Sequence, residues 1–148
     1  MFRRLITAAI LSIAFGVSAF AADTKPHRVA IQVNQNDPQV MNLALNNATN
    51  VLEYYRGKHE EVEIDIVTYG PGLHMLRADT SPVQDRLKRL KEMAFPGKVQ
   101  FSACDNTKQG MEKTEGKAIS IVFDATMVPS GVVRIMELQE QGWSYVRP

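Results

Sequence analysis

Short apolar runs and amphipathic segments alternate along the chain from residue 29 onward. The run Val29 to Val33 is apolar and rich in β-branched residues, which predicts a buried strand. Asp37-Pro38 then supplies a helix N-cap with proline at the first helical position. From Val40 to Tyr55 apolar residues recur at steps of three and four, and this spacing predicts an amphipathic helix that Gly57 closes.

The next segments repeat this order. Val62 to Val67 predicts a second strand, which ends in the turn Tyr69-Gly70-Pro71-Gly72. Ser81-Pro82-Val83-Gln84 has the Ser-x-x-Gln pattern of a capping box, which predicts a helix start. That helix is stopped by Pro96-Gly97, and its predicted core stripe is Val83, Leu87, Leu90 and Ala94.

A third predicted strand covers Lys98 to Ala103. It leads directly into Cys104-Asp105-Asn106-Thr107 and a short polar helix that reaches about Lys113. A fourth strand lies between residues 118 and 128, where two apolar segments compete for the role. These segments are Ile119 to Phe123 and Ala125 to Val128.

Pro129 opens the last predicted helix, which ends at Gln141-Gly142 and precedes a short strand from Trp143 to Val146. The apolar residues of this helix spread beyond one stripe: Val132, Val133, Ile135, Met136 and Leu138. Because one sheet face can cover only part of that arc, the remainder predicts a contact between subunits.

The regular alternation of strands and helices predicts the fold class. Strands separated by helices favour right-handed crossovers, a mainly parallel sheet and helices on both faces. We therefore predict α/β architecture, as a single three-layer domain over residues 22–148 with a five-stranded sheet.

Composition and charge agree with one globular domain and exclude some partners. The chain has 148 residues, of which 45% are hydrophobic and 22% charged. It has 17 Lys and Arg against 16 Asp and Glu, and without Arg3 and Arg4 the balance is 15 minus 16, or −1. This balance argues against nucleic acid or an anionic membrane as partner.

Residues 1–21 have the pattern of a cleavable signal peptide. Arg3 and Arg4 form a positive start, Leu5 to Phe20 is an uncharged and mostly apolar run, and Ala19-Phe20-Ala21 offers small residues at the cleavage site. The 16-residue run is shorter than the roughly 20 residues that span a bilayer. We predict cleavage after Ala21, a periplasmic or secreted location and no stable membrane insertion.

Four segments in this order resemble the DsrE/DsrF-like family of small sulfur-relay proteins. They are Tyr69-Gly70-Pro71-Gly72-Leu73, Phe101-Ser102-Ala103-Cys104-Asp105-Asn106-Thr107, Val128-Pro129-Ser130-Gly131-Val132, and Leu138-Gln139 through Gly142-Trp143. The resemblance extends from about His27 to Pro148. It implies a five-stranded sheet, assembly into homotrimers or homohexamers, and a cysteine at the end of the third strand that accepts sulfur as a persulfide. Cys104 stands at that place.

Cys104 is the only cysteine, so no disulfide can form within one chain. If Asn106 or Thr107 caps the following helix, the helix N-terminus lies near the sulfur and favours the thiolate, whereas the neighbouring Asp105 opposes a second anion. Free cysteines are also among the most buried residues. A reactive thiol and a small buried side chain therefore both stay open.

Other candidate groups surround the glycine-rich turn. Gly70 and Gly72 could hold an anion through backbone N–H groups or simply form a structural turn. His74 and Met75 could join Cys104 at a copper or zinc ion, but no ligand spacing supports a metal or other cofactor, and we predict neither.

Two sets of charged residues have ordinary explanations. Arg77 and Asp79 could position a substrate or pair with each other. A solvated helix face accounts for the remaining cluster, which consists of Arg86, Lys88, Arg89 and Lys91.

Two functional hypotheses follow. The first is an exported DsrE-like protein that binds or carries sulfur on Cys104, in a pocket edged by Gly70 to His74 and by Asn106 and Thr107. The second is a non-catalytic oligomeric module that binds a small ligand or a partner. A hydrolase ranks third, because the sequence has no Gly-x-Ser-x-Gly elbow and no Ser-His-Asp order.

Overall fold

A computed structural model describes residues 25–148, so the predicted signal peptide lies outside the described residues. Strands and helices alternate along this part of the chain. The strands are β1 (His27–Val33), β2 (Val62–Thr68), β3 (Lys98–Cys104), β4 (Ala125–Val128) and β5 (Ser144–Val146). The helices are α1 (Pro38–Gly57), α2 (Gln84–Met93), α3 (Asp105–Glu115) and α4 (Gly131–Glu140), with a 3-10 helix, η1 (Gly70–Leu76), after β2.

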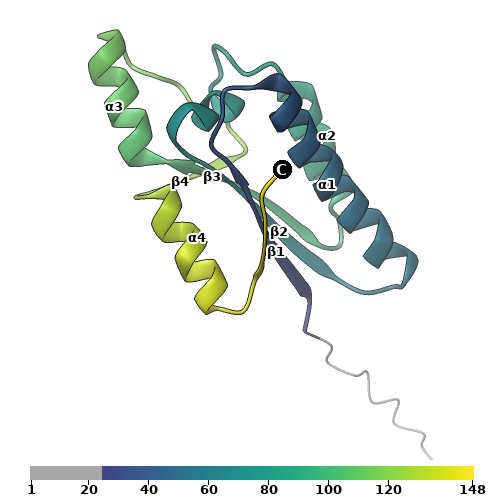
Figure 1. Cartoon of the computed structure of the whole chain (residues 1–148). Helices are drawn as coiled ribbons and strands as arrows, with labels where there is room; N and C mark the ends of the chain where they lie inside the picture. Colours follow the sequence, from purple (N-terminus) through teal and green to yellow (C-terminus); the bar gives the residue numbers. More distant parts are fainter. Residues whose placement is uncertain (1–24) are drawn as a thin grey trace, which may run out of the picture.

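The strands form one sheet in the order β4-β3-β2-β1-β5, and every neighbouring pair is parallel. The chain therefore steps outward from β1 to β4 and then returns to the other side of β1. Figure 1 shows α1 and α2 on one side of the sheet and α4 on the other. This arrangement confirms the predicted α/β fold with a parallel five-stranded sheet and helices on both faces.

The two faces of the sheet have different cores. The larger core lies under α1 and α2 and includes Ile31, Ile64 and Phe101. The smaller one lies under α4 and consists of Ala30, Val67, Ile135 and Leu138, with Tyr69 and Trp143 at its border. Because side chains alternate along a strand, the two cores assign each strand residue to a face.

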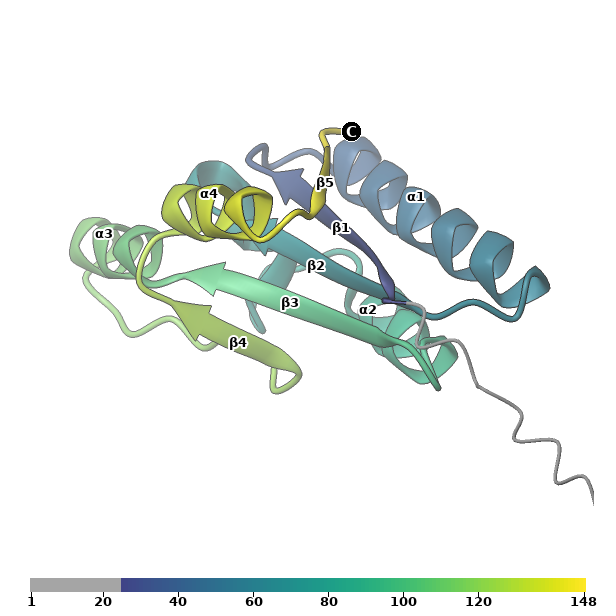
Figure 2. The same cartoon turned by 90° about the horizontal axis from the view of Figure 1, so that it is seen from below.

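Alternation along β3 places Cys104 on the α4 side. Phe101 and Ala103 belong to the larger core under α1 and α2. Ser102 points the other way and takes part in a hydrogen-bond network with α4. Cys104, two residues further on, shares the face of Ser102. Figure 2 shows α3 continuing from the carboxyl end of β3, so this residue lies where the strand becomes a helix.

The structure decides between some local alternatives and corrects other local predictions. The turn after β2 is the start of η1, and the fourth strand is Ala125–Val128 and not the segment Ile119 to Phe123. The capping box at Ser81 does not form, since the N-cap of α2 is Val83 and the helix begins at Gln84. The Ser81 hydroxyl instead donates to the carbonyl of Met75 at 2.6 Å. Its oxygen also accepts the N–H of Val83 at 3.3 Å, so Ser81 joins η1 to the segment just before α2.

The end of α1 also differs from the expectation that Gly57 closes it. Gly57 is the last helical residue, and the left-handed residue is His59, with φ +57°. The N–H of His59 donates to the carbonyl of Arg56, and that of Glu60 donates to Tyr55. This pair of hydrogen bonds is a Schellman motif with histidine in the place that glycine usually takes.

No helix within residues 25–148 has both the length and the hydropathy required to cross a bilayer.

Candidate functional site

Cys104 is the last residue of β3 and also the N-cap of α3. Its sulfur accepts a hydrogen bond from the backbone N–H of Thr107 at 3.4 Å. The N-cap is therefore neither Asn106 nor Thr107, the two residues considered from the sequence. Because β3 passes into α3 without an intervening loop, capping falls on the last residue of the strand, which brings the sulfur to the helix N-terminus.

The thiol is buried, with 4% of Cys104 exposed. None of the five main cavities in residues 25–148 is lined by Cys104, Gly70 or His74. The largest has a volume of about 520 Å³ and lies beside the start of α2. The pocket expected between the Gly70 to His74 segment and the cysteine is thus not among them. In this conformation the sulfur is held by hydrogen bonding and packing.

Two further predicted residues lie next to the cysteine. The hydroxyl of Thr107 accepts a hydrogen bond from the backbone N–H of Gly70 at 2.9 Å, which joins η1 to the first turn of α3. The N–H of Asn106 donates to the carbonyl of Pro129, which lies just before α4, at 3.3 Å. The start of α3 is therefore tied to the segments that follow β2 and β4.

The two glycines of η1 have structural explanations. Gly70 adopts a left-handed conformation with φ +52°, and its N–H is bonded to Thr107. A Cβ atom at Gly72 would lie 2.2 Å from the carbonyl oxygen of Val33, so only glycine fits there. The N–H of Gly72 donates to Tyr69 at 3.2 Å. Because both N–H groups are occupied, the geometry favours a structural turn over an anion cradle.

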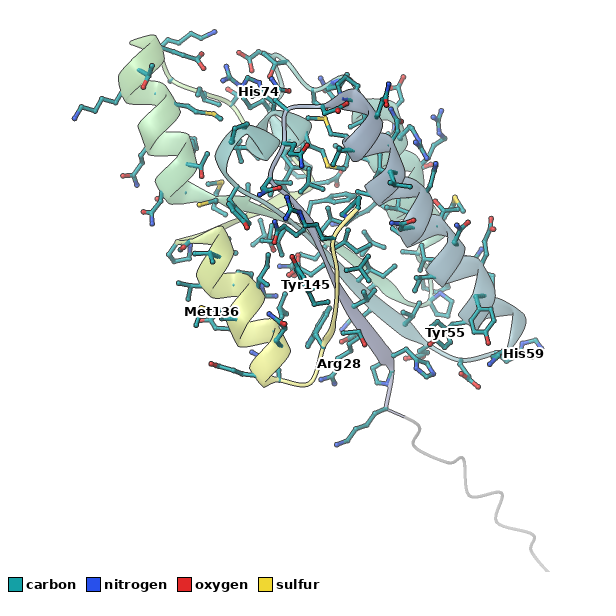
Figure 3. The ribbon with its side chains drawn as sticks, viewed as in Figure 1. Arg28, Tyr55, His59, His74, Met136 and Tyr145 are labelled. Atoms are coloured by element: carbon teal, nitrogen blue, oxygen red, sulfur yellow. The ribbon has the colours of Figure 1, made fainter. Side chains whose placement is uncertain are left out.

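His74 and Met75 point to different surroundings. Nδ1 of His74 forms a hydrogen bond with the hydroxyl of Thr80 at 2.8 Å, whereas Met75 is fully buried in the larger core. In Figure 3, His74 lies at the end of the sheet opposite Arg28 and His59. Within residues 25–148, no three His, Cys, Asp or Glu side chains gather as a metal site. The metal interpretation of His74, Met75 and Cys104 therefore gains no support.

Arg77 is buried and forms a charged network, of which the sequence suggested only the pair with Asp79. Its guanidinium donates two hydrogen bonds to Asp79, at 2.9 and 2.8 Å, and two to Glu115, at 2.5 and 2.9 Å. These bonds raise the pKa of Arg77 and lower the pKa of Asp79 and that of Glu115. Lys117 adds a second cation beside both carboxylates. The network ties the end of η1 to the end of α3.

A second buried network lies under α4 and was missed. The carboxylate of Asp65, in the middle of β2, accepts hydrogen bonds from Ser102 Oγ at 2.7 Å and from Arg134 Nε at 2.9 Å. Gln100 donates to Ser102 at 3.0 Å. Burial raises the pKa of Asp65, while Ser102 and Arg134 oppose that change. An acidic residue inside a strand that is covered on both faces was the available signal, since such strands are usually apolar throughout.

The basic cluster on α2 is only partly a solvated face. Arg86 is half-buried and donates hydrogen bonds to the side-chain oxygens of Asn42 and Asn46 on α1, at 2.6 and 2.7 Å. Arg86 therefore joins α1 to α2, whereas Lys88 and Arg89 are exposed.

Comparison with known proteins extends the resemblance drawn from the sequence. The solved structure of a protein of unknown function, MTH1491 from Methanobacterium thermoautotrophicum, is similar with a TM-score of 0.67 and 28% sequence identity. The similarity covers 82% of this chain and 99% of that one. No curated protein matches the chain. The profile of the DsrE/DsrF-like family matches residues 27–148, which include every strand and helix described above, and the chain therefore belongs to the DsrE/DsrF-like family.

Proposed function

We propose that this protein is an exported DsrE-like sulfur carrier that holds sulfur as a persulfide on Cys104. The observation that carries the proposal is the position of the sulfur, at the carboxyl end of β3 and at the N-terminus of α3, with a backbone N–H donating to it. Ligand sites of open α/β sheets lie at the carboxyl ends of the strands.

The transfer step needs only the thiolate and a sulfur donor such as a polysulfide. The thiolate of Cys104 attacks a sulfur atom of the polysulfide, a new S–S bond forms, and an S–S bond within the donor breaks. The electron pair leaves with the shortened polysulfide, so no other oxidant is required. The N–H groups and the dipole at the start of α3 would stabilise the anion before and after transfer.

One charge next to the thiol acts against this role. Asp105 follows Cys104 and would oppose an anionic sulfur. Its carboxylate, however, accepts a hydrogen bond at 2.6 Å from the side chain of Gln109, one turn along α3. The Asp105 side chain is thus held along α3.

The single cysteine favours a carrier over a turnover enzyme. A persulfide on Cys104 has no second thiol in the same chain to release its sulfur. An external thiol would have to attack the outer sulfur and regenerate the Cys104 thiolate. The sulfur would therefore stay on the protein until an acceptor arrives.

Location and assembly complete the proposal. The signal-like segment of residues 1–21 supports export to the periplasm or the medium, followed by cleavage after Ala21. Three exposed apolar residues on the outer side of α4, Val132, Val133 and Met136, support a homotrimer or homohexamer. Figure 3 shows Met136 pointing away from the sheet.

A second candidate function rests on the burial of the thiol. Since only 4% of Cys104 is exposed, the cysteine could serve as a small apolar side chain in an oligomeric module that binds a ligand or partner elsewhere. In that case Cys104→Ser would leave function and assembly intact.

The discriminating experiment treats the folded protein with polysulfide and measures its intact mass with and without reductant. A carrier gains one sulfur atom that reductant removes, and the Cys104→Ser variant gains none. If the wild-type mass stays unchanged, and the thiol resists alkylation until the protein is denatured, the binding module is the better description.

A further inference from the structure

A buried thiol can react only if some of the residues packed around it move. The inference that follows from this rests on the proposed function, in which Cys104 reacts with a sulfur donor. Cys104 shares its face of β3 with Ser102, and α4 packs on that face. The sheet under α1 and α2 has a far larger apolar core than the sheet under α4. Because each buried apolar side chain contributes to holding a helix in place, α4 is the less firmly packed layer.

The attachment of α4 depends heavily on one ion pair. Arg134, near the start of α4, donates through Nε to one carboxylate oxygen of Asp65 at 2.9 Å, and its Nη2 lies 2.9 Å from the same oxygen as an ion pair. Asp65 is fully buried, and its other carboxylate oxygen accepts the hydroxyl of Ser102 at 2.7 Å. Losing Arg134 would leave a buried carboxylate without its cation, which is costly. The guanidinium of Arg134 thus joins α4 to both β2 and β3.

The start of α4 lies at the cysteine. Val128, the last residue of β4, is the register partner of Cys104, and Pro129 accepts the N–H of Asn106. Gly131, the first residue of α4, packs so closely on Tyr69 that a Cβ atom would lie 2.8 Å from the tyrosine Cβ. A displacement of α4 would therefore pull on the segment that neighbours the sulfur.

We propose that Asp65 and Arg134 are positioning residues that control access to Cys104 by holding α4 on the sheet. When the pair is intact, α4 and the segment before it keep the thiol buried. When the pair separates, α4 moves outward and a sulfur donor or an acceptor thiol reaches Cys104.

The test measures how fast iodoacetamide alkylates Cys104 in the folded full-length mature protein, residues 22–148. Arg134→Gln should raise the rate about tenfold or more, because the local opening that exposes the thiol becomes less costly. Arg134→Lys, which keeps the charge with fewer contacts, should give an intermediate rate. Arg28→Gln is the matched control, since Arg28 pairs with Glu63 at 3.3 Å on the same face of the sheet, at the other end of the strands.

The dependence of the rate on urea separates local opening from unfolding. A rate set by movement of α4 is nearly constant at low urea, whereas a rate set by global unfolding rises steeply because far more surface is exposed. Circular dichroism at each urea concentration reports the folded fraction. If Arg134→Gln fails to fold, Arg134→Lys and Ser102→Ala provide the same comparison.

Several results would overturn the inference. One is an equal alkylation rate in wild type and in the Arg134 variants, another is an equal increase with Arg28→Gln, and a third is a rate that follows unfolding at every urea concentration. A different result is expected if the access inference is correct but the sulfur-carrier function is wrong. In that case Cys104 in Arg134→Gln reacts quickly with iodoacetamide and takes no sulfur from polysulfide.

Discussion

The backbone N–H of Gly70 donates to the hydroxyl of Thr107 at 2.9 Å, and this hydrogen bond joins η1 to the helix that Cys104 caps. Gly70 is left-handed and is separated by Tyr69 alone from β2, the strand that neighbours β3. Thr107 uses its own N–H for the cysteine sulfur. Thr107 is therefore hydrogen-bonded both to η1 and to the sulfur of Cys104.

Replacing Thr107 by valine should destabilise the protein and loosen the thiol. The valine has nearly the same shape but cannot accept the N–H of Gly70, and an unpaired, partly buried N–H costs about 1–2 kcal/mol. Thr107→Ser retains the hydroxyl and should lie close to wild type. Urea denaturation measures the free energy of unfolding, and equal values for the valine and serine variants would contradict the assigned role.

Replacing Arg77 by methionine should lower stability by about 2 kcal/mol. The arginine is buried and bonded to two carboxylates, but those carboxylates are partly exposed, so water can recover part of the loss. Thermal unfolding monitored by circular dichroism provides the measurement. Arg89→Met, an exposed change on α2, serves as the control and should alter stability little.

The same network predicts how stability changes with pH. The pKa values of Asp79 and Glu115 are lowered in the folded state from 3.8 and 4.5. Their contribution is therefore complete above those unfolded values and disappears as the pH falls through the folded pKa values. The difference in unfolding free energy between wild type and Arg77→Met should shrink as the pH falls below about 4.5.

The pKa of Asp65 is shifted in the opposite direction, so Asp65 changes the pH dependence of stability in the opposite sense. For this reason the comparison uses the difference in unfolding free energy between wild type and Arg77→Met. The pKa of Asp65 is raised, so its contribution is greatest at low pH and is lost as the pH rises through the folded value. Because Asp65 is present in both proteins, its contribution cancels. A difference between wild type and Arg77→Met that stays constant from pH 7 to about pH 3 would contradict the proposed role of the two carboxylates.

Replacing His59 by glycine should stabilise the end of α1 by about 0.5–1 kcal/mol. The residue has φ +57° in a Schellman motif, where glycine has no steric penalty. His59→Ala keeps the Cβ atom in the same strained conformation and should show no gain. The midpoint of urea unfolding distinguishes the two variants. Equal midpoints would mean that the left-handed conformation costs little here.

The outer side of α4 should hold copies of the chain together. Val132, Val133 and Met136 are exposed, and Met136 has 54% of its surface open to solvent. Met136→Lys should therefore dissociate the assembly with little effect on the fold, because the lysine reaches water in the monomer. Light scattering at micromolar concentration measures the mass. A wild-type monomer under those conditions would contradict the predicted homotrimer or homohexamer.

Local sequence patterns were enough to predict the alternation of strands and helices along the chain. Apolar spacing of two or of three to four residues is a local property, so the helix from Pro38 and the strand ending at Val33 could be predicted, and the third strand was predicted to within one residue, to Ala103. The short segment Ala125 to Val128 could not be separated from its competitor, because both are apolar and of strand length. The resemblance to the family was likewise correct, since its motifs are contiguous.

Contacts between distant residues could not be predicted in this way. Arg77 and Glu115 lie 38 positions apart, and Asp65 and Arg134 lie 69 apart. Periodicity tells which side of an element faces the core, but it carries no information about the strand order that brings α4 over β2 and β3. The surroundings of Cys104 have the same origin, because hydrogen bonds join the start of α3 to segments that follow β2 and β4. The place of Cys104 between a strand and a helix can therefore be predicted from local sequence, whereas packing between distant segments decides whether its thiol is accessible.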